Sequence, residues 1–99
     1  VGQKMRFMVR DASGSRADIT EHCLSLKREQ FTRTLTGGPP TPPYFGALMF
    51  NCNGRAEGLY EEKNVDTDIF HTYVPTPVSG FFCNGEIGRI GSTTYLHAF

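Results

Sequence analysis

Apolar and polar residues alternate along the first part of the chain. Met5, Phe7 and Val9 are apolar, and the cations Lys4 and Arg6 directly precede Met5 and Phe7. Successive side chains of a β-strand point to opposite faces, so this alternation is typical of a strand with one buried face. The pattern predicts a first strand over residues 3–9.

The apolar positions then change to helical spacing. Ile19, Cys23 and Leu26 recur at intervals of three or four residues, which places them on one face of an α-helix. Ser15 precedes this segment, and its hydroxyl is suited to satisfy a free backbone N–H group at a helix start. The sequence predicts an amphipathic helix over residues 16–31, capped by Ser15 and ending near residues 32–33.

A proline-rich segment follows the predicted helix. Residues 36–43 read TGGPPTPP, and four prolines with two glycines are incompatible with regular structure. The segment predicts an irregular surface loop. Its composition is also typical of an extended polyproline ligand for a partner domain.

Three strands and one helix are predicted in the second half. The apolar run over residues 44–52 predicts a strand buried on both faces. Residues 66–73 predict a short helix that Asp66 caps. The Val-Pro pair that follows stops this helix. The last two predicted strands cover residues 77–83 and 93–99.

These elements occur in the order β-α-β-α-β-β. They predict an α+β domain over residues 1–99 with a mixed sheet of about four strands and two helices mainly on one face. The strands over 77–83 and 93–99 are expected to form a closing antiparallel hairpin. Both ends of the chain lie inside apolar runs, so we expect a fragment of a longer protein.

Composition narrows the class of function. Ten basic and ten acidic residues cancel, which disfavours nucleic acid as a partner because a broad positive field is missing. The sequence contains no apolar run long enough for a membrane span. Three cysteines without an N-glycosylation sequon favour an intracellular, reducing compartment. Cytoplasm and an organelle interior such as the plastid stroma are not distinguished.

The tripeptide Cys-Asn-Gly occurs twice, at residues 52–54 and 83–85. A nucleophilic cysteine needs a nearby base, and none of the three histidines stands in a recognised cysteine-hydrolase motif. A zinc site needs about four ligands at short paired spacings, whereas Cys52 and Cys83 are 31 residues apart. We therefore expect no enzyme activity, no metal and no cofactor. Each cysteine is interpreted as a small buried side chain or a pocket-lining one.

Glycines recur at positions 85, 88 and 91, after the second Cys-Asn-Gly. This is not the dinucleotide-binding fingerprint, because the glycines do not open a helix. The simpler interpretation is a glycine-rich hairpin that needs positive φ angles. Exposed backbone N–H groups in such a loop are also able to bind a carboxylate.

Three stretches together resemble the C-terminal half of the FIST domain, a family of bacterial signal-transduction proteins and eukaryotic F-box proteins. They are GALMFNCNGR, FHTYVPTPVSGFFCNGEIG and TTYLHAF. Arg89 and Ala56 depart from the family pattern, in which proline and glycine are common at these places. The resemblance implies a sensory domain that binds small ligands such as amino acids. The matching motif residues are Gly54, Arg55, Pro77, Gly80, Phe81, Phe82, Gly85, Glu86, Ile87 and Gly88.

Glu86 and Arg55 are the predicted centre of a ligand site. Each follows one of the two Cys-Asn-Gly units, so they would face each other if the two strand ends are adjacent. Arg55 would hold the carboxylate of an amino acid bidentately, and Glu86 would hold its ammonium group. The complete predicted set also contains Cys52, Cys83, Gly85 and Gly88.

Two functions are therefore open. The first is a non-catalytic ligand-binding sensory domain. The second is an interaction or structural subunit of a larger protein assembly, since apolar chain ends and a proline-rich loop favour protein partners. A polar cleft between the Cys52 and Cys83 turns would favour the first function, and a filled space beneath exposed apolar surfaces would favour the second.

Overall fold

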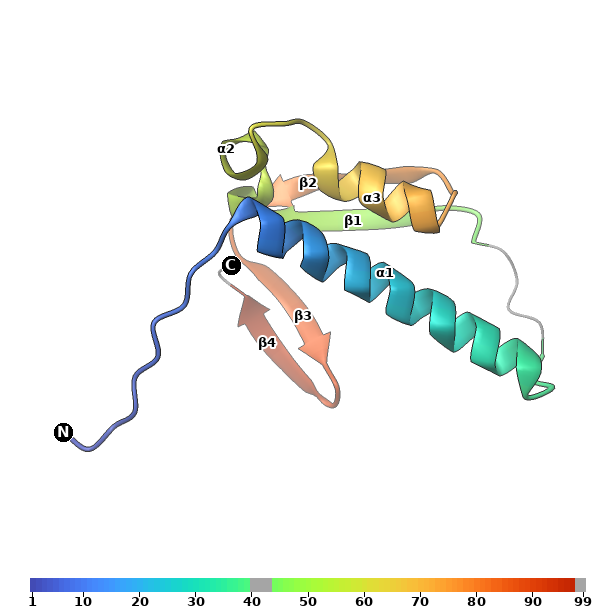
Figure 1. Ribbon diagram of the computed structural model, residues 1–99, viewed down its shortest axis with the longest axis horizontal. Coiled ribbons are helices and arrows are strands. Elements are labelled where there is room, and N and C mark those ends of the chain that lie inside the picture. The colour runs from blue at the N-terminus through green and yellow to red at the C-terminus, as the bar shows by residue number, and fades with distance from the viewer. Residues whose placement is uncertain (40–43, 98–99) are drawn as a thin grey trace.

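The computed structural model of the protein describes residues 1–39 and 44–97. The chain is an α+β structure, as predicted, with four strands in two small sheets in place of one mixed sheet (Figure 1). The elements in chain order are α1 (Ala12–Leu35), β1 (Ala47–Cys52), the 3-10 turn η1 (Asn53–Arg55), α2 (Glu57–Tyr60), α3 (Val65–Tyr73), β2 (Val78–Cys83), β3 (Glu86–Ile90) and β4 (Thr93–His97).

The strand predicted over residues 3–9 is wrong. This segment has no secondary structure and its side chains are exposed, and it extends away from the rest of the chain (Figure 1). An alternating pattern yields a strand only when a neighbouring backbone supplies hydrogen-bond partners. Within residues 1–39 and 44–97, no strand pairs with it.

Helix α1 is longer than the sequence predicted at both ends. Its N-cap is Asp11, whose carboxylate accepts a hydrogen bond from the backbone N–H of Gly14. Ser15, the predicted cap, is inside the helix and buried. At the other end Gly37 has a φ of +74°, a conformation that glycine adopts readily at helix ends. Of the predicted loop 36–43, residues 40–43 lie outside the described residues.

Strands β1 and β2 form a parallel pair in which Ala47 pairs with Val78 and Cys52 with Cys83. Parallel neighbours need a crossover connection, and η1, α2 and α3 provide it. Helix α3 nearly matches the prediction of 66–73. Gly80 is required by the close approach of the strands, because a Cβ atom there would lie 1.7 Å from the carbonyl oxygen of Met49.

The closing hairpin differs from the prediction. Strand β4 pairs with β3, not with β2, and Glu86 is in register with His97. Residues 86–90 were expected to be part of a turn because of their glycines, but only Gly85 and Gly91, at the two ends of β3, have positive φ angles of +99° and +62°. The end of the predicted strand 93–99 includes residues 98–99, which lie outside the described residues.

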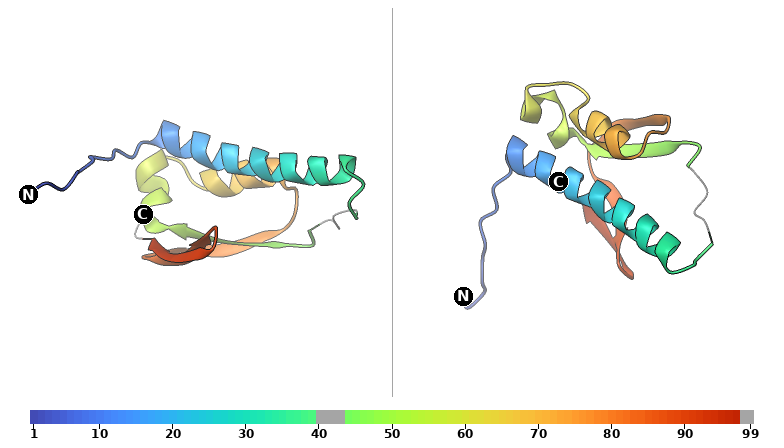
Figure 2. Two further views of the ribbon diagram at one scale, coloured as in Figure 1. Left: turned by 90° about the horizontal axis from the view of Figure 1, so that it is seen from below. Right: turned by 45° about the vertical axis from the view of Figure 1, so that its right-hand side comes forward.

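The helices lie on one face of the β1–β2 sheet, as predicted, and α1 packs against α3 (Figure 2). The two layers are held together by a small core of apolar and polar side chains. The buried residues are Ser15, Cys23, Tyr60, Val65, Asp66, Val74 and Thr76.

Within the described residues, no helix has the length and apolar character needed to cross a membrane.

Candidate functional site

A largely buried ion pair joins η1, the turn that follows β1, to the start of α3. Arg55 donates from Nε to Oδ2 of Asp66 at 2.7 Å and from Nη2 to Oδ1 at 3.0 Å. The Asp66 side chain is only 4% exposed and that of Arg55 is 21% exposed. Two parallel N–H···O bonds fix both position and orientation, which a single ammonium group would not do.

Three further polar groups complete this network. Tyr60 donates its hydroxyl to Oδ1 of Asp66 at 2.7 Å, and Asn51 donates its amide to Oδ2 at 2.8 Å. Arg55 also donates to the backbone oxygen of Ser15 at 3.0 Å. The Asp66 carboxylate thus joins β1, η1 and α2 to α3, and Arg55 connects α1 to the network through Ser15. Both oxygens of the carboxylate are satisfied.

The network changes the proton affinity of two of its members. Burial, with a smaller contribution from the hydrogen bond to Asp66, raises the pKa of Tyr60 to about 12. The hydrogen bond to Asp66 raises the pKa of Arg55 above its ordinary value. Both shifts keep the network in one protonation state at neutral pH, with a neutral phenol and a charged guanidinium.

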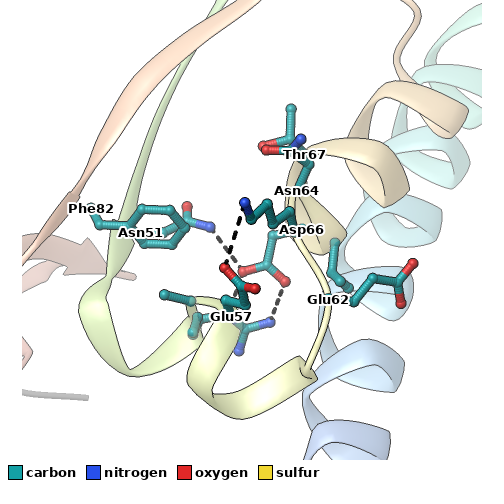
Figure 3. Close-up of a pocket in the computed structure, with 11 residues that line it drawn as sticks. Asn51, Glu57, Glu62, Asn64, Asp66, Thr67 and Phe82 are labelled. Atoms are coloured by element: carbon teal, nitrogen blue, oxygen red, sulfur yellow. Dashed lines mark hydrogen bonds and ion pairs between the residues drawn. The ribbon is translucent and has the colours of Figure 1, made fainter.

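A cavity of about 290 Å³ opens beside the network (Figure 3). Asn51, Arg55 and Asp66 line it, and Phe82 supplies an apolar wall. The pocket also contains a more exposed ion pair, in which Nζ of Lys63 lies 4.0 Å from Oε2 of Glu57. A second hollow of about 360 Å³ shares Asn51, Asn64, Thr67 and Phe82 with the first. The remaining residues around the first cavity are Ala56, Glu62, Asn64, Val65 and Thr67.

The position of the cavity follows from the topology. Asn51 and Phe82 each lie one residue before the end of a parallel strand, and the cavity extends from them to the first residues of α3. In sheets with parallel strands, ligands bind beyond the carboxyl ends of the strands, because the loops that follow leave a crevice there.

The structure brings together only part of the predicted site. Cys52 and Cys83 are register partners, which confirms that the two Cys-Asn-Gly units meet at one edge of a sheet. Arg55 lines the cavity, but its ion pair is with Asp66 and not with Glu86. Glu86 begins β3, and its Oε1 is buried without a hydrogen-bond partner. Gly85 precedes β3 and Gly88 lies within it, where a Cβ would contact the ring of His97.

Sequence reasoning missed the main partners of Arg55. Asp66 was interpreted as a helix cap, but Asn64 is the N-cap residue and the Asp66 carboxylate points into the network. Tyr60 and Asn51 were not singled out. The available signal was the pair of acids at the start of α3, Asp66 and Asp68. Either one stabilises a helix N-terminus, which leaves the other free to bond elsewhere.

Potential metal ligands do not gather at this site. Across residues 1–39 and 44–97, no three His, Cys, Asp or Glu side chains are grouped closely enough to hold a metal ion.

Comparison with known proteins shows two kinds of relative. An uncharacterized protein of Mycobacterium bovis is 36% identical over 100 residues, covering 100% of this chain and 23% of that protein. An uncharacterized protein of Mycobacterium tuberculosis is 33% identical over 100 residues, again covering 100% of this chain and 24% of the relative. Human F-box only protein 22 is 49% identical over 43 residues, which are 41% of this chain and 11% of that protein.

The chain thus spans under a quarter of the length of the mycobacterial relatives. No solved structure matches it. FIST C domains are associated with sensory proteins of signal transduction. The model of the FIST C domain matches residues 1–89, and the chain therefore belongs to the FIST C family.

Proposed function

We propose that the chain is a non-catalytic, small-ligand-binding part of a sensory domain and that its ligand is an amino acid. The observation that carries this proposal is the cavity beside the Arg55–Asp66 pair, which presents both signs of charge and an apolar wall. Its volume is at the lower end of the range for small-molecule sites. A free amino acid has the matching chemistry, since it carries a carboxylate, an ammonium group and a short side chain.

Lys63 and Glu57 are the groups that would bind the two charges. Their 4.0 Å contact is long, and both side chains are largely exposed, so little is lost when each exchanges its partner for a ligand group. The ligand carboxylate would bind Lys63, and the ammonium group would bind Glu57. Arg55 is the member of the sequence-predicted set that lines the cavity. Its ion pair with Asp66 would keep this part of the cavity wall in place.

Calorimetric titration with a panel of free amino acids tests this proposal. At least one is expected to bind, and Lys63→Gln and Glu57→Gln should each weaken binding by about tenfold or more, because each removes a charge-assisted hydrogen bond. Lys27→Gln, on the exposed side of α1, is the matched control and should bind like the wild type. Absence of binding by every amino acid would overturn the proposal.

A second function, an interaction module, is favoured by a different observation. Leu48 and Phe81 are 73% and 65% exposed on the sheet, and Phe50 contacts Phe81 edge-to-face with ring centroids 5.1 Å apart. Exposed apolar side chains that gather on one sheet face are typical of a protein interface. The similarity of part of the chain to an F-box protein also fits protein partners.

The partner of this surface would be another apolar protein face, and a second copy of the chain meets that description. Sedimentation at increasing concentration tests it directly. Wild type is expected to dimerise, and Phe81→Ser should remain monomeric. A wild-type chain that stays monomeric at every concentration would contradict self-association.

A further inference from the structure

Cys52 and Cys83 occupy corresponding positions at the carboxyl ends of two neighbouring strands. They are the last register pair of the parallel β1–β2 sheet. Both are free thiols of intermediate exposure. Their relationship does not depend on the ligand cavity or on any metal.

The two cysteine side chains lie on the same face of the sheet. Side chains of register partners point to the same side, and side chains two residues apart along a strand do so as well. Phe50 and Phe81, two residues before the cysteines, are in register and their rings are in contact. On the other face, Met49 and Asn51 bond to residues of α3. The cysteines therefore share the face that the helices leave uncovered.

The spacing of the strands suits a covalent bond between them. Neighbouring strands lie about 4.8 Å apart, which falls within the Cα–Cα range of about 4.4–6.8 Å found for disulfides. Neither sulfur is tightly held. Sγ of Cys52 accepts a bond from the N–H of Gly54 at 3.4 Å, and Sγ of Cys83 lies 3.8 Å from the carbonyl oxygen of Phe81. Rotation of either side chain therefore breaks only one long, weak contact.

The third cysteine gives an internal contrast. Cys23 is 4% exposed in the interface of α1 with the rest of the chain, and burial raises the pKa of its thiol. Because the thiolate is the reactive form, Cys23 is shielded from oxidants both sterically and chemically.

We propose that Cys52 and Cys83 form a modification site, a dithiol that a low-molecular-weight disulfide such as oxidised glutathione converts to an intramolecular disulfide. One cysteine thiolate attacks a glutathione sulfur, forms a mixed disulfide and releases one glutathione thiolate. The second cysteine thiolate attacks the protein sulfur of that mixed disulfide and releases the other glutathione thiolate. In total, two protein thiols are oxidised and one disulfide molecule is reduced to two thiols.

The bond would join strand ends that carry residues of the cavity. Asn51 precedes Cys52, Phe82 precedes Cys83, and both line the cavity. The 3-10 turn with Arg55 begins directly after Cys52. Oxidation of this site would therefore fix the relative position of the two strands at their carboxyl ends.

The test is incubation of the full chain with excess oxidised glutathione, followed by intact mass measurement and counting of free thiols under denaturing conditions. Wild type is expected to lose two hydrogen atoms in mass, and its three thiols should fall to one. Peptide mapping should identify the bond as Cys52–Cys83. Cys23→Ser should form the same bond at the same rate.

The single variants separate the two chemical steps. Cys52→Ser and Cys83→Ser are each expected to retain one glutathione as a stable mixed disulfide, because the resolving thiol is missing. Circular dichroism confirms that each variant is folded. Wild type that keeps three thiols, that accumulates only glutathione adducts, or that links Cys23 to either of the others would overturn the proposal.

Discussion

Arg55 and Asp66 form a two-bond ion pair that links η1 to the first turn of α3, with N···O distances of 2.7 and 3.0 Å. Because Tyr60 and Asn51 bond to the same carboxylate, Asp66 is the common acceptor of a network that holds β1, η1 and α2 against α3 beside the candidate cavity. Removal of its charge affects every member at once.

Asp66→Asn should therefore lower the free energy of unfolding by about 3 kcal/mol, since it leaves a largely buried guanidinium without its counter-ion. Urea denaturation measures the change. Asp68→Asn is the matched control, because Asp68 lies two residues later on the same helix and is exposed; its effect should stay within about 0.5 kcal/mol. Equal effects of the two substitutions would show that the ion pair does not stabilise the fold.

Gly80 and Met49 define the closest approach of β1 and β2. Gly80→Ala would place a Cβ 1.7 Å from the Met49 carbonyl oxygen, and because that atom belongs to the backbone, the strands must move apart. We expect a loss of at least about 2 kcal/mol in the free energy of unfolding. In Gly58→Ala, the control, the new Cβ meets nothing within 4 Å, and better helix propensity should make it neutral or stabilising by up to about 1 kcal/mol. A Gly80→Ala chain as stable as wild type would contradict the observed spacing.

The elements that the sequence predicted well are those whose signal is local. Helix α3 and strands β1 and β2 were found within a few residues, because their apolar runs are bounded by proline, glycine and Asn-Gly turns. The predicted Arg55–Glu86 site required the two Cys-Asn-Gly strand ends to be adjacent, and the register pair of Cys52 with Cys83 confirms that they are.

The errors concern interactions between elements, which the pattern within one segment does not specify. Residues 3–9 have the alternation of a strand but no strand partner among the described residues. Strand β3 was missed because its glycine pattern favoured a turn. Pairing with β4 makes these residues a strand. Arg55 was assigned to Glu86 by its motif neighbours, while its true acceptor is 11 residues away on another element. Local pattern does not encode which of several carboxylates a guanidinium reaches.

Asp11 caps helix α1. The sequence predicted this cap four residues later, at Ser15. Asp11→Ala removes the acceptor for the N–H of Gly14 and should lower the free energy of unfolding by about 1 kcal/mol. Urea denaturation with helical ellipticity as the signal measures this loss. Ser13→Ala, at an exposed position in the same turn, should change little. If Ser15→Ala but not Asp11→Ala lost helix, the cap would be at the position first predicted.

Tyr60 makes the stability of the chain depend on pH in the alkaline range. Its pKa is raised from 10.0 to about 12, first by burial and then by the hydrogen bond to Asp66, so the folded state holds the phenolic proton more tightly than the unfolded state does. The resulting stabilisation is complete below about pH 10 and is lost as pH rises toward 12, by roughly 2–3 kcal/mol in all. Lysines and other tyrosines also titrate there, so the informative quantity is the difference in unfolding free energy between wild type and Tyr60→Phe. This difference should shrink between about pH 10 and about pH 12. A difference that stays constant would show that the phenol of Tyr60 is not held neutral by the network.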